Sequence, residues 1–220
     1  MGPSDSLRLR RLATITGGLS PKSVVSSQTG YFFAQNMMYR HTVGVYDREF
    51  RLVKTIRDRV DLSEFGLATE RTVVQGSPVE AAITPDGRSV YISQYTMYGS
   101  GYDRPGADTC YPAEQRDPSF VYRIDIASLA IDQVLPVGAT PKHLAVSPNG
   151  RRLLVANWCS YDLSVFDLET LQEIRRILIG PYPRGITFSP DSRTAYIAVM
   201  GSTWIGVLDM QTLELGRIKN

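Results

Sequence analysis

The chain has 220 residues, 43% of them hydrophobic, and a formal net charge of +2 from 24 basic and 22 acidic residues. This length suits one domain with a sizeable core, and the balanced charge does not favour nucleic acid or an anionic membrane as a partner. No apolar run approaches the roughly 18–20 residues of a membrane-spanning helix, and two cysteines and two histidines without a paired cluster predict no metal site and no cofactor.

The first 21 residues are expected to form two segments of different character. Residues 1–10 are expected to be a disordered or tag-like start, and the N-terminus lacks the apolar core of a signal peptide, so an export signal is expected outside this chain. Residues 11–21, RLATITGGLSP, match residues 174–183, IRRILIGPYP, at the end of a later unit. They predict an outermost strand whose three partner strands are not upstream.

Four stretches that open on a proline then follow, and each continues to a hydrophobic pair and an aspartate. The prolines are Pro21, Pro78, Pro141 and Pro183, and the aspartates are Asp47, Asp125, Asp167 and Asp209. The last two prolines and the last two aspartates are each 42 residues apart. Two landmarks with the same period indicate tandem repeats, with units at about 21–76, 77–138, 139–180 and 181–220.

Each unit has the pattern of short strands. Runs such as HLAVS, RLLVAN and DLSVFD are rich in β-branched and aromatic residues and are separated by turn signals. The first turn is SPNG, TPDG or SPDS, and a second hairpin follows the aspartate, as in DLETLQE. Four antiparallel strands in roughly 40–45 residues are typical of a β-propeller blade. The aspartates themselves are expected to shape the turn after the third strand.

The pattern P-x(5)-SPDG-x-x-x-YV-x-N…V-x-V-x-D, clearest from Pro141 to Asp167, resembles the YVTN-type repeat of bacterial β-propellers, which include lactonase-like and surface-layer-like proteins. The resemblance covers nearly the whole chain and implies an all-β propeller of four-stranded antiparallel blades. The WD40 signature is not met, because neither Trp158 nor Trp204 precedes an aspartate. Departures are SSQTG in the first turn, a long segment before Pro78, and an insertion at 96–119.

Counting blades predicts an incomplete ring. Four units and one extra N-terminal strand make fewer blades than most relatives of this repeat have, so the propeller domain at 11–220 is expected to be truncated at its C-terminus. The alternative is a small closed ring of four blades with the N-terminal strand packed as an extra edge. An open ring leaves an apolar blade face uncovered.

Propeller geometry places the insertion 96–119 and the loop WCSY at 158–161 on one face, in neighbouring blades. Cys110 and Cys159 are therefore expected to form a disulfide that holds the insertion. Closing this loop reduces the entropy of the unfolded chain and stabilises the fold by about 4 kcal/mol. Two buried free thiols, or a catalytic or metal-binding thiol, are the alternatives. A disulfide indicates an oxidising compartment, which is periplasmic, cell-surface or secreted.

The residue after each opening proline is expected at the rim of the central channel. These residues are Lys22, Val79, Lys142 and Arg184, and the next positions hold Glu80 and His143 in the second and third units. Three cations around one axis predict a site for a small anionic ligand. The alternatives are that they are solvated rim residues or that Glu80 offsets the charge internally.

Aromatic and polar residues crowd the same face and predict an interaction surface. The set is Asn36, Met37, Met38, Tyr39, Arg40, His41, Tyr95, Met97, Tyr98, Tyr102, Asn157, Trp158, Tyr161, Met200 and Trp204. The alternative is structural: the asparagines cap turns and the aromatics pack between blades.

These features favour a non-catalytic module that binds a ligand or a protein outside the cytoplasm. A hydrolase of lactonase type is an alternative, for which only His143, Glu80 and His41 qualify as acid–base groups, without a recognisable spacing. A sensory ectodomain of a larger membrane protein is a third possibility. Fold alone assigns none of them.

Overall fold

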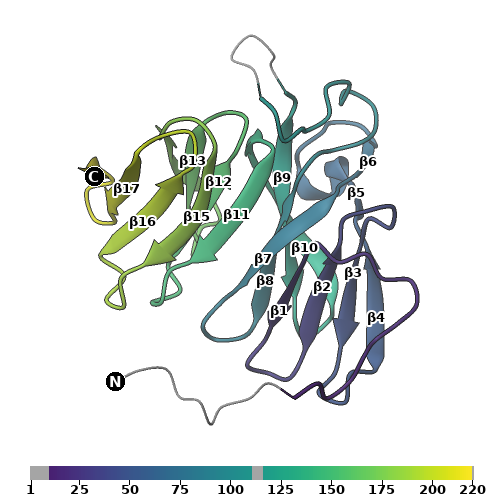
Figure 1. The fold of residues 1–220 in the computed structure, drawn as a ribbon. Coiled ribbons are helices and arrows are strands. Elements are labelled where there is room, and N and C mark those ends of the chain that lie inside the picture. Colours follow the sequence, from purple (N-terminus) through teal and green to yellow (C-terminus); the bar gives the residue numbers. More distant parts are fainter. Residues whose placement is uncertain (1–9, 111–115, 220) are drawn as a thin grey trace.

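The computed structural model describes residues 10–110 and 116–219. Their strands form four four-stranded antiparallel sheets, each with its strands in chain order, and one two-stranded sheet. We call the four larger sheets blades 1 to 4; they stand next to one another in an arc (Figure 1). The prediction of an all-β chain of four-stranded antiparallel units is confirmed.

The strands of the blades have the following bounds. Blade 1 consists of β1 (Ser23–Ser26), β2 (Phe32–Asn36), β3 (Thr42–Tyr46) and β4 (Leu52–Arg57). Blade 2 consists of β7 (Pro78–Ile83), β8 (Ser89–Gln94), β9 (Pro118–Asp125) and β10 (Ala130–Ala139). Blade 3 consists of β11 (Pro141–Val146), β12 (Arg152–Asn157), β13 (Asp162–Asp167) and β14 (Glu173–Leu178). Blade 4 consists of β15 (Pro183–Phe188), β16 (Thr194–Val199), β17 (Trp204–Asp209) and β18 (Leu215–Lys219).

The first strand of each blade is the innermost one. β1 lies beside β7, β7 beside β11, and β11 beside β15. Figure 1 shows blade 1 and blade 4 at opposite ends of the arc. The described residues therefore form an open arc and not a closed ring of four blades.

Tight hairpins join the first and second strands. In the SPNG turn of blade 3, Asn149 Oδ1 accepts the N–H of Arg151 at 3.0 Å, and Gly150 takes a left-handed φ of 71°. Blade 4 has Ser192 at that position, with φ 61°, and its hydroxyl accepts the N–H of Asn149 at 3.0 Å. The contact links the two turns, so a neighbouring blade supports the residue in the less favourable conformation.

An aspartate follows or closes the third strand of every blade and shapes the turn into the fourth. Asp167 Oδ1 accepts the backbone N–H groups of Glu169 and Thr170 at 2.9 and 3.1 Å. The aspartates of the other blades make the same kind of contact, and these backbone hydrogen bonds lower the pKa of all four carboxyls. The structural role predicted for the repeated aspartates is confirmed.

The hydrophobic core lies between neighbouring blades. Leu154 and Leu163 of blade 3 pack in one cluster with Ile186 and Ile197 of blade 4, and none of the four is more than 7% exposed. Equivalent clusters lie between blades 1 and 2 and between blades 2 and 3. Each inner blade therefore buries one face against the blade before it and the other against the blade after it.

The N-terminal segment differs from the prediction. Residues 11–21 form no strand. An outermost strand pairs with the third strand of its own blade, and in every described blade that third strand already has its fourth strand as partner. The prediction for residues 1–10 falls almost entirely on residues 1–9, which lie outside the described residues.

The long segment before Pro78 forms a small unit of its own between blades 1 and 2. β5 (Arg59–Asp61) pairs with β6 (Val73–Gln75), and a short 3₁₀ helix, η1 (Leu62–Phe65), lies between them. Asp61 caps this helix by accepting the N–H of Ser63 at 3.1 Å, and Gly66 ends it with φ 70°. The sequence marked this segment only as a departure from the repeat.

Candidate functional site

The loops between the second and third strands of the blades meet the starts of the innermost strands on one face of the propeller. We call this face the rim. The same backbone contact recurs there in three blades. Tyr95 N–H donates to Ser77 O at 2.8 Å, and Trp158 N–H donates to Thr140 O at 3.0 Å. In blade 4 the N–H of Met200 donates to the carbonyl of Tyr182 at 3.0 Å. The rim therefore gathers residues that are far apart in the sequence, as the propeller geometry predicted.

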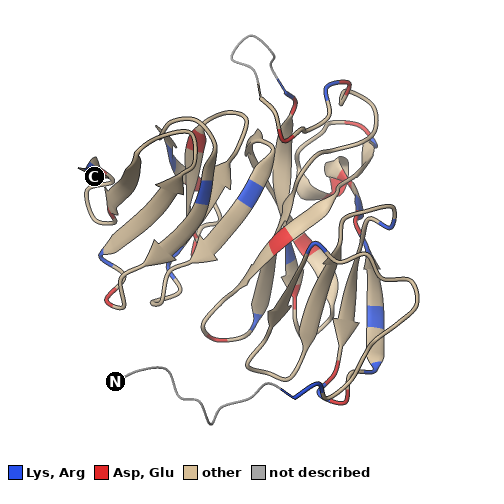
Figure 2. Cartoon of the chain, viewed as in Figure 1, with Lys and Arg blue, Asp and Glu red and all other residues tan. Residues whose placement is uncertain are grey.

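Two rim charges are already paired with each other. Arg184 Nη2 of β15 lies 2.6 Å from Glu80 Oε1 of β7, across the intervening β11. Figure 2 shows the acidic segment on β7 and the basic segments on β11 and β15 along the inner side of the arc. Glu80 thus supplies the internal offset that the sequence left as an alternative to an anion site.

His143 lies beside this pair. Its Nδ1 accepts the N–H of Ile186 at 3.2 Å, which places the proton of the neutral ring on Nε2, 3.9 Å from Glu80 Oε2. Burial lowers the pKa of His143, and the Arg184 charge acts in the same direction, against the attraction of Glu80. The neutral ring at pH 7 therefore offers no free lone pair to a substrate.

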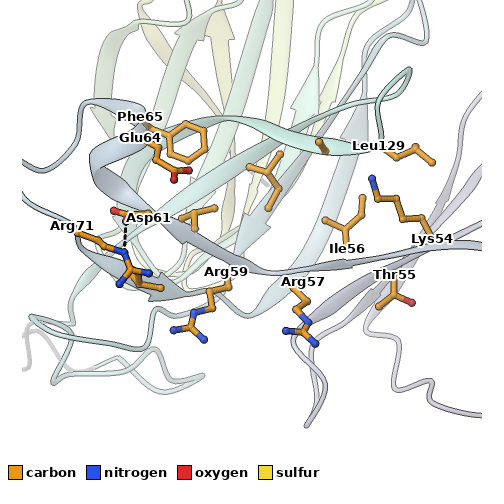
Figure 3. A pocket seen from close by; sticks show the side chains of 14 residues that line it. Lys54, Thr55, Ile56, Arg57, Arg59, Asp61, Glu64, Phe65, Arg71 and Leu129 are labelled. Atoms are coloured by element: carbon orange, nitrogen blue, oxygen red, sulfur yellow. Dashed lines mark ion pairs between the residues drawn. The ribbon is translucent and has the colours of Figure 1, made fainter.

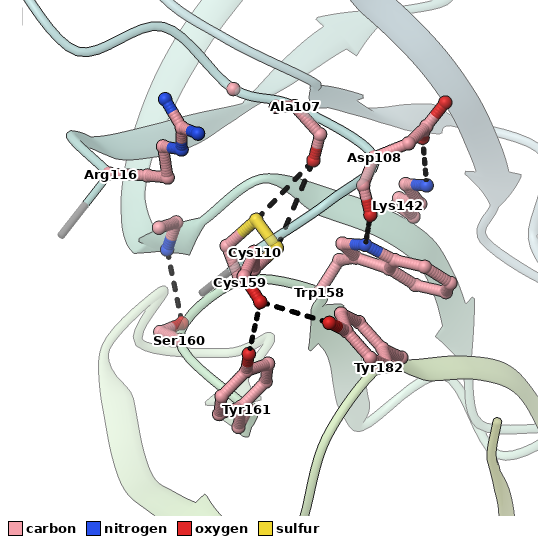
Figure 4. Close-up of a disulfide and its surroundings, with 12 residues drawn as sticks. Ala107, Asp108, Cys110, Arg116, Lys142, Trp158, Cys159, Ser160, Tyr161 and Tyr182 are labelled. Atoms are coloured by element: carbon pink, nitrogen blue, oxygen red, sulfur yellow. Dashed lines mark hydrogen bonds and ion pairs between the residues drawn. A yellow bond between two sulfur atoms is a disulfide. The ribbon is translucent and has the colours of Figure 1, made fainter. Parts of the chain in front are cut away.

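A disulfide anchors the inserted loop 95–117 to blade 3. Cys110 and Cys159 are bonded, with their Cα atoms 5.2 Å apart, which confirms the predicted pairing (Figure 4). The hydroxyls of Tyr161 and Tyr182 both donate to the Cys110 carbonyl, at 2.8 and 2.9 Å. Tyr182 was missed in the sequence, although its place directly before Pro183 puts it at the rim.

Asp108 forms a second anchor of the insertion. Its backbone carbonyl accepts the indole N–H of Trp158 at 2.7 Å, and its carboxylate lies 2.5 Å from the ammonium of Lys142 (Figure 4). Lys142 is 8% exposed and its ammonium lies 3.7 Å from the centre of a Trp158 ring. Burial lowers the pKa of Lys142, whereas the hydrogen bond from Lys142 lowers the pKa of Asp108. The sequence did not single out Asp108, since nothing local marks it as a partner for Lys142.

Of the five residues predicted to bind an anion, the structure brings Glu80, His143 and Arg184 together and gives Lys142 its own partner. Lys22 is exposed, and no ion pair of its side chain is present among the described residues. Its charge contributes to the lowered pKa of Asp108, which is consistent with a position on the same rim. Among the described residues, Lys22 is therefore the rim cation with an exposed side chain and no ion pair.

The residues predicted as an interaction face fall into two groups. Asn36 and Asn157 are buried and hold loops: Asn36 Oδ1 accepts the N–H of Ser20 at 3.1 Å, and Asn157 Nδ2 donates to Asp162 Oδ1 at 2.6 Å. Trp158 and Tyr161 hold the insertion as described above. Trp204 packs against the core between blades 3 and 4, with the Arg217 guanidinium 4.3 Å from its ring. The structure gives these five side chains structural contacts.

The second group is accessible and lies on blade 1 and the first part of the insertion. Tyr39 is 89% exposed and Tyr98 44%, and Arg40 is exposed. His41 is half-buried; its Nδ1–H donates to the carbonyl of Gly76 at 3.1 Å, and its ring packs edge-on against Tyr98 with centroids 5.2 Å apart. This patch and Lys22 make up the accessible part of the predicted face.

A buried acid lies beneath that patch. Asp58, between β4 and β5, is 2% exposed, and its Oδ1 accepts the side-chain N–H of Gln94 at 3.0 Å. Asp58 Oδ2 and Gln94 Oε1 are both buried acceptors without a donor among the described residues, and both lie close to the open side of Gly76. A proton on Asp58 removes the buried negative charge and turns one of these acceptors into a donor. Burial raises the pKa of Asp58 well above its usual range, and the Gln94 hydrogen bond opposes this only in part.

A surface hollow of about 490 Å³ lies away from the rim, between β4, the β5–β6 unit and the turn that leads into β10 (Figure 3). Arg71 pairs with Asp61 there at 3.4 Å, and Lys54 Nζ donates to the carbonyl of Ser128 at 3.2 Å. None of the residues predicted as a site lines this hollow. It is a groove beside the outer strand of blade 1.

Solved structures identify the architecture. Hydrazine synthase from Kuenenia stuttgartiensis is 19% identical, with a TM-score of 0.65 over 96% of this chain and 53% of that chain. A Bacteroides uniformis protein assigned provisionally as a 6-phosphogluconolactonase is 16% identical, with a TM-score of 0.60 over 88% of this chain and 52% of that chain. The fold is that of a β-propeller.

Dihydro-heme d1 dehydrogenase NirN matches this propeller arc as well, at 17% identity and a TM-score of 0.55 over 86% of this chain and 34% of that chain. This propeller chain spans about half the length, or less, of these three structures. No family model and no curated protein matches the sequence. At these identities the likeness concerns the fold alone.

The disulfide can be tested on the double variant Cys110→Ser, Cys159→Ser. Opening a loop with a sequence separation of 49 residues is expected to lower the free energy of unfolding by at most about 4 kcal/mol. The hydrogen bonds to Asp108 and Cys110 carbonyls still hold the loop, so the folded variant should keep its far-UV spectrum. Urea unfolding followed by far-UV circular dichroism measures the free energy of unfolding and the spectrum. A thiol count without reductant measures the pairing in the wild type. Two free thiols in the folded wild type would contradict the pairing.

The buried acid predicts a loss of stability as pH rises. The folded-state pKa of Asp58 lies above its unfolded value near 4, so the folded protein binds more protons in that interval, and the free energy of unfolding falls from about pH 4 upward. Asp58→Asn keeps the shape and donates an amide N–H to Gln94 Oε1. It is expected to remove this slope and to add about 1–3 kcal/mol at the upper end of the interval.

Urea unfolding between pH 4 and pH 8 measures this effect, and Asp103→Asn, an exposed position, is the matched control. Equal pH slopes for wild type and Asp58→Asn would show that Asp58 is ionised in the folded protein.

Proposed function

We propose that this chain is a non-catalytic β-propeller module of the YVTN-type repeat that binds a ligand or protein outside the cytoplasm. The observation that carries the proposal is the state of the rim: Arg184 and Lys142 are paired with carboxylates of the chain, while Lys22 and an aromatic patch are exposed. A surface of this kind is preorganised for recognition, because its groups need no rearrangement to meet a partner.

The Cys110–Cys159 disulfide supports the proposed compartment. Such bonds persist in oxidising environments and are rare in the cytosol, so the bond supports a periplasmic, cell-surface or secreted location. The described residues include no helix long and apolar enough to cross a membrane. The disulfide also supports the proposed binding role, because it fixes the inserted loop at the rim, where we propose that the ligand binds.

The proposed ligand class rests on the rim charges that have no partner within the chain. Arg184 and Lys142 are already paired with carboxylates, so a ligand that used them would have to displace an internal ion pair. Lys22 imposes no such cost. We infer that the rim takes a carboxylate or phosphate group at Lys22, with apolar or aromatic parts of the same ligand or protein against Tyr39 and Tyr98.

A hydrolase of lactonase type has less support. His143 accepts a backbone N–H with Nδ1 and directs Nε2 toward Glu80. His41 directs Nδ1–H to a backbone carbonyl and not to a carboxylate. General-base catalysis at neutral pH requires a free imidazole nitrogen within reach of the substrate, usually oriented by an acid.

The proposal is tested by calorimetric titration of small carboxylates and inorganic phosphate into wild type and Lys22→Ala. Loss of the exposed cation is expected to weaken binding about tenfold, or about 1.4 kcal/mol. Lys54→Ala, a basic position at the hollow of blade 1 and away from the rim, is the matched control and should bind as wild type does.

Equal heats for wild type and Lys22→Ala would end the anion-site proposal. Proton release on mixing the protein with a small lactone, followed at constant pH, would instead support the hydrolase. A titration without heat for any small anion, together with binding of a protein partner, would move the site to the Tyr39–Tyr98 patch.

A further inference from the structure

The outward face of blade 4 is apolar and uncovered among the described residues. Tyr196, Ile205 and Ile218 are 37%, 46% and 51% exposed. They share one face of the sheet, because Tyr196 pairs with Val207, and Ile205 pairs with both Ala198 and Ile218. An apolar patch of this kind spans the second, third and fourth strands.

The same positions in blade 3 are buried by its neighbour. One repeat of 42 residues before Tyr196 and Ile205 stand Leu154 and Leu163. Both are 0% exposed and pack in the cluster with Ile186 and Ile197 of blade 4. Blade 3 therefore shows what the equivalent face of blade 4 is suited to contact: the front face of a following blade.

The opposite kind of face is uncovered on blade 1. Val24 and Leu52 are 57% and 56% exposed, and Phe32 is half-buried beside Phe50 at a centroid distance of 5.8 Å. The register places Val24 with Ala34, and Phe32 and Leu52 with Tyr46, on one side of the sheet.

Blade 3 again supplies the reference for this second face. Leu144 and Leu153 occupy the positions of Val24 and Phe32 in its repeat, and they are 2% and 0% exposed. They lie in the cluster that joins blade 3 to blade 2. The uncovered face of blade 1 is therefore a front face that no other blade covers among the described residues.

We propose that the outward face of blade 4 of one copy docks head to tail on the front face of blade 1 of a second copy. The contact continues a packing that the chain repeats three times between its own blades, and it joins the two kinds of face that pair there. This arrangement is a heterologous interface, and it closes into a ring if the rotation between copies permits.

The proposal concerns the ends of the arc and is independent of ligand binding at the rim. Exposed apolar patches of this kind favour association.

Sedimentation velocity over a wide range of protein concentration tests the contact on the full chain. Wild type is expected to form a dimer. Ile205→Asp on blade 4 and Val24→Asp on blade 1 should each weaken association by about tenfold or more, because each buries a charge in an apolar interface. Leu178→Asp, 75% exposed on the fourth strand of blade 3, is the matched control and should associate as wild type does.

Mixing the two variants separates head-to-tail docking from other contacts. Ile205→Asp keeps an intact blade 1 face and Val24→Asp an intact blade 4 face, so an equimolar mixture should form a heterodimer that neither variant forms alone. All three substituted positions are exposed, and circular dichroism confirms that each variant is folded. A monomeric wild type at every concentration overturns the proposal, as does association that only one of the two variants disrupts.

Discussion

Each blade of this chain carries apolar side chains on both of its faces, so a sheet gains stability from each neighbouring sheet that covers one of them. The burial of Leu154 and Leu163 under blade 4 and of Leu144 and Leu153 against blade 2 is this constraint within one blade. Apolar burial of the order of 25 cal/mol per Å² makes such faces the dominant stabilising contribution. The arc, the rim and the turns that support each other across blade boundaries all follow from it.

Stacking sheets around an axis has an electrostatic consequence. The residue after the opening proline of each unit is brought to the same rim, and three of these four residues are cations. Their repulsion is offset in two ways: Arg184 reaches across to Glu80, and Lys142 is covered by Trp158 and neutralised by Asp108. The insertion that carries Asp108 is thus a surface loop of blade 2 that also contributes to the charge balance of the rim.

The insertion uses the aromatic residues of neighbouring blades as its anchor points. Trp158, Tyr161 and Tyr182 each direct a polar N–H or O–H group to a backbone carbonyl of the loop, and the disulfide adds a covalent link. A long surface loop has few backbone partners of its own, so these contacts decide its position. The exposed aromatic surface is correspondingly smaller than the composition of the face suggests, and it lies on blade 1 and the first part of the insertion.

The sequence by itself determined the four-stranded units, the turns between them and the disulfide. A period of 42 residues and the strand order within a unit fix which loops share a face, and this was enough to pair Cys110 with Cys159. It did not determine the β5–β6 unit or the absence of a strand at 11–21. The sequence of 11–21 is similar to the end of another unit, but each third strand of the described blades already pairs with its own fourth strand. Only the tertiary structure decided which charges are paired and which aromatics are free. Contacts such as Lys142 with Asp108 and Asp58 with Gln94 join residues of different elements, and no local pattern encodes the approach of two side chains whose distance depends on how the blades and insertions pack.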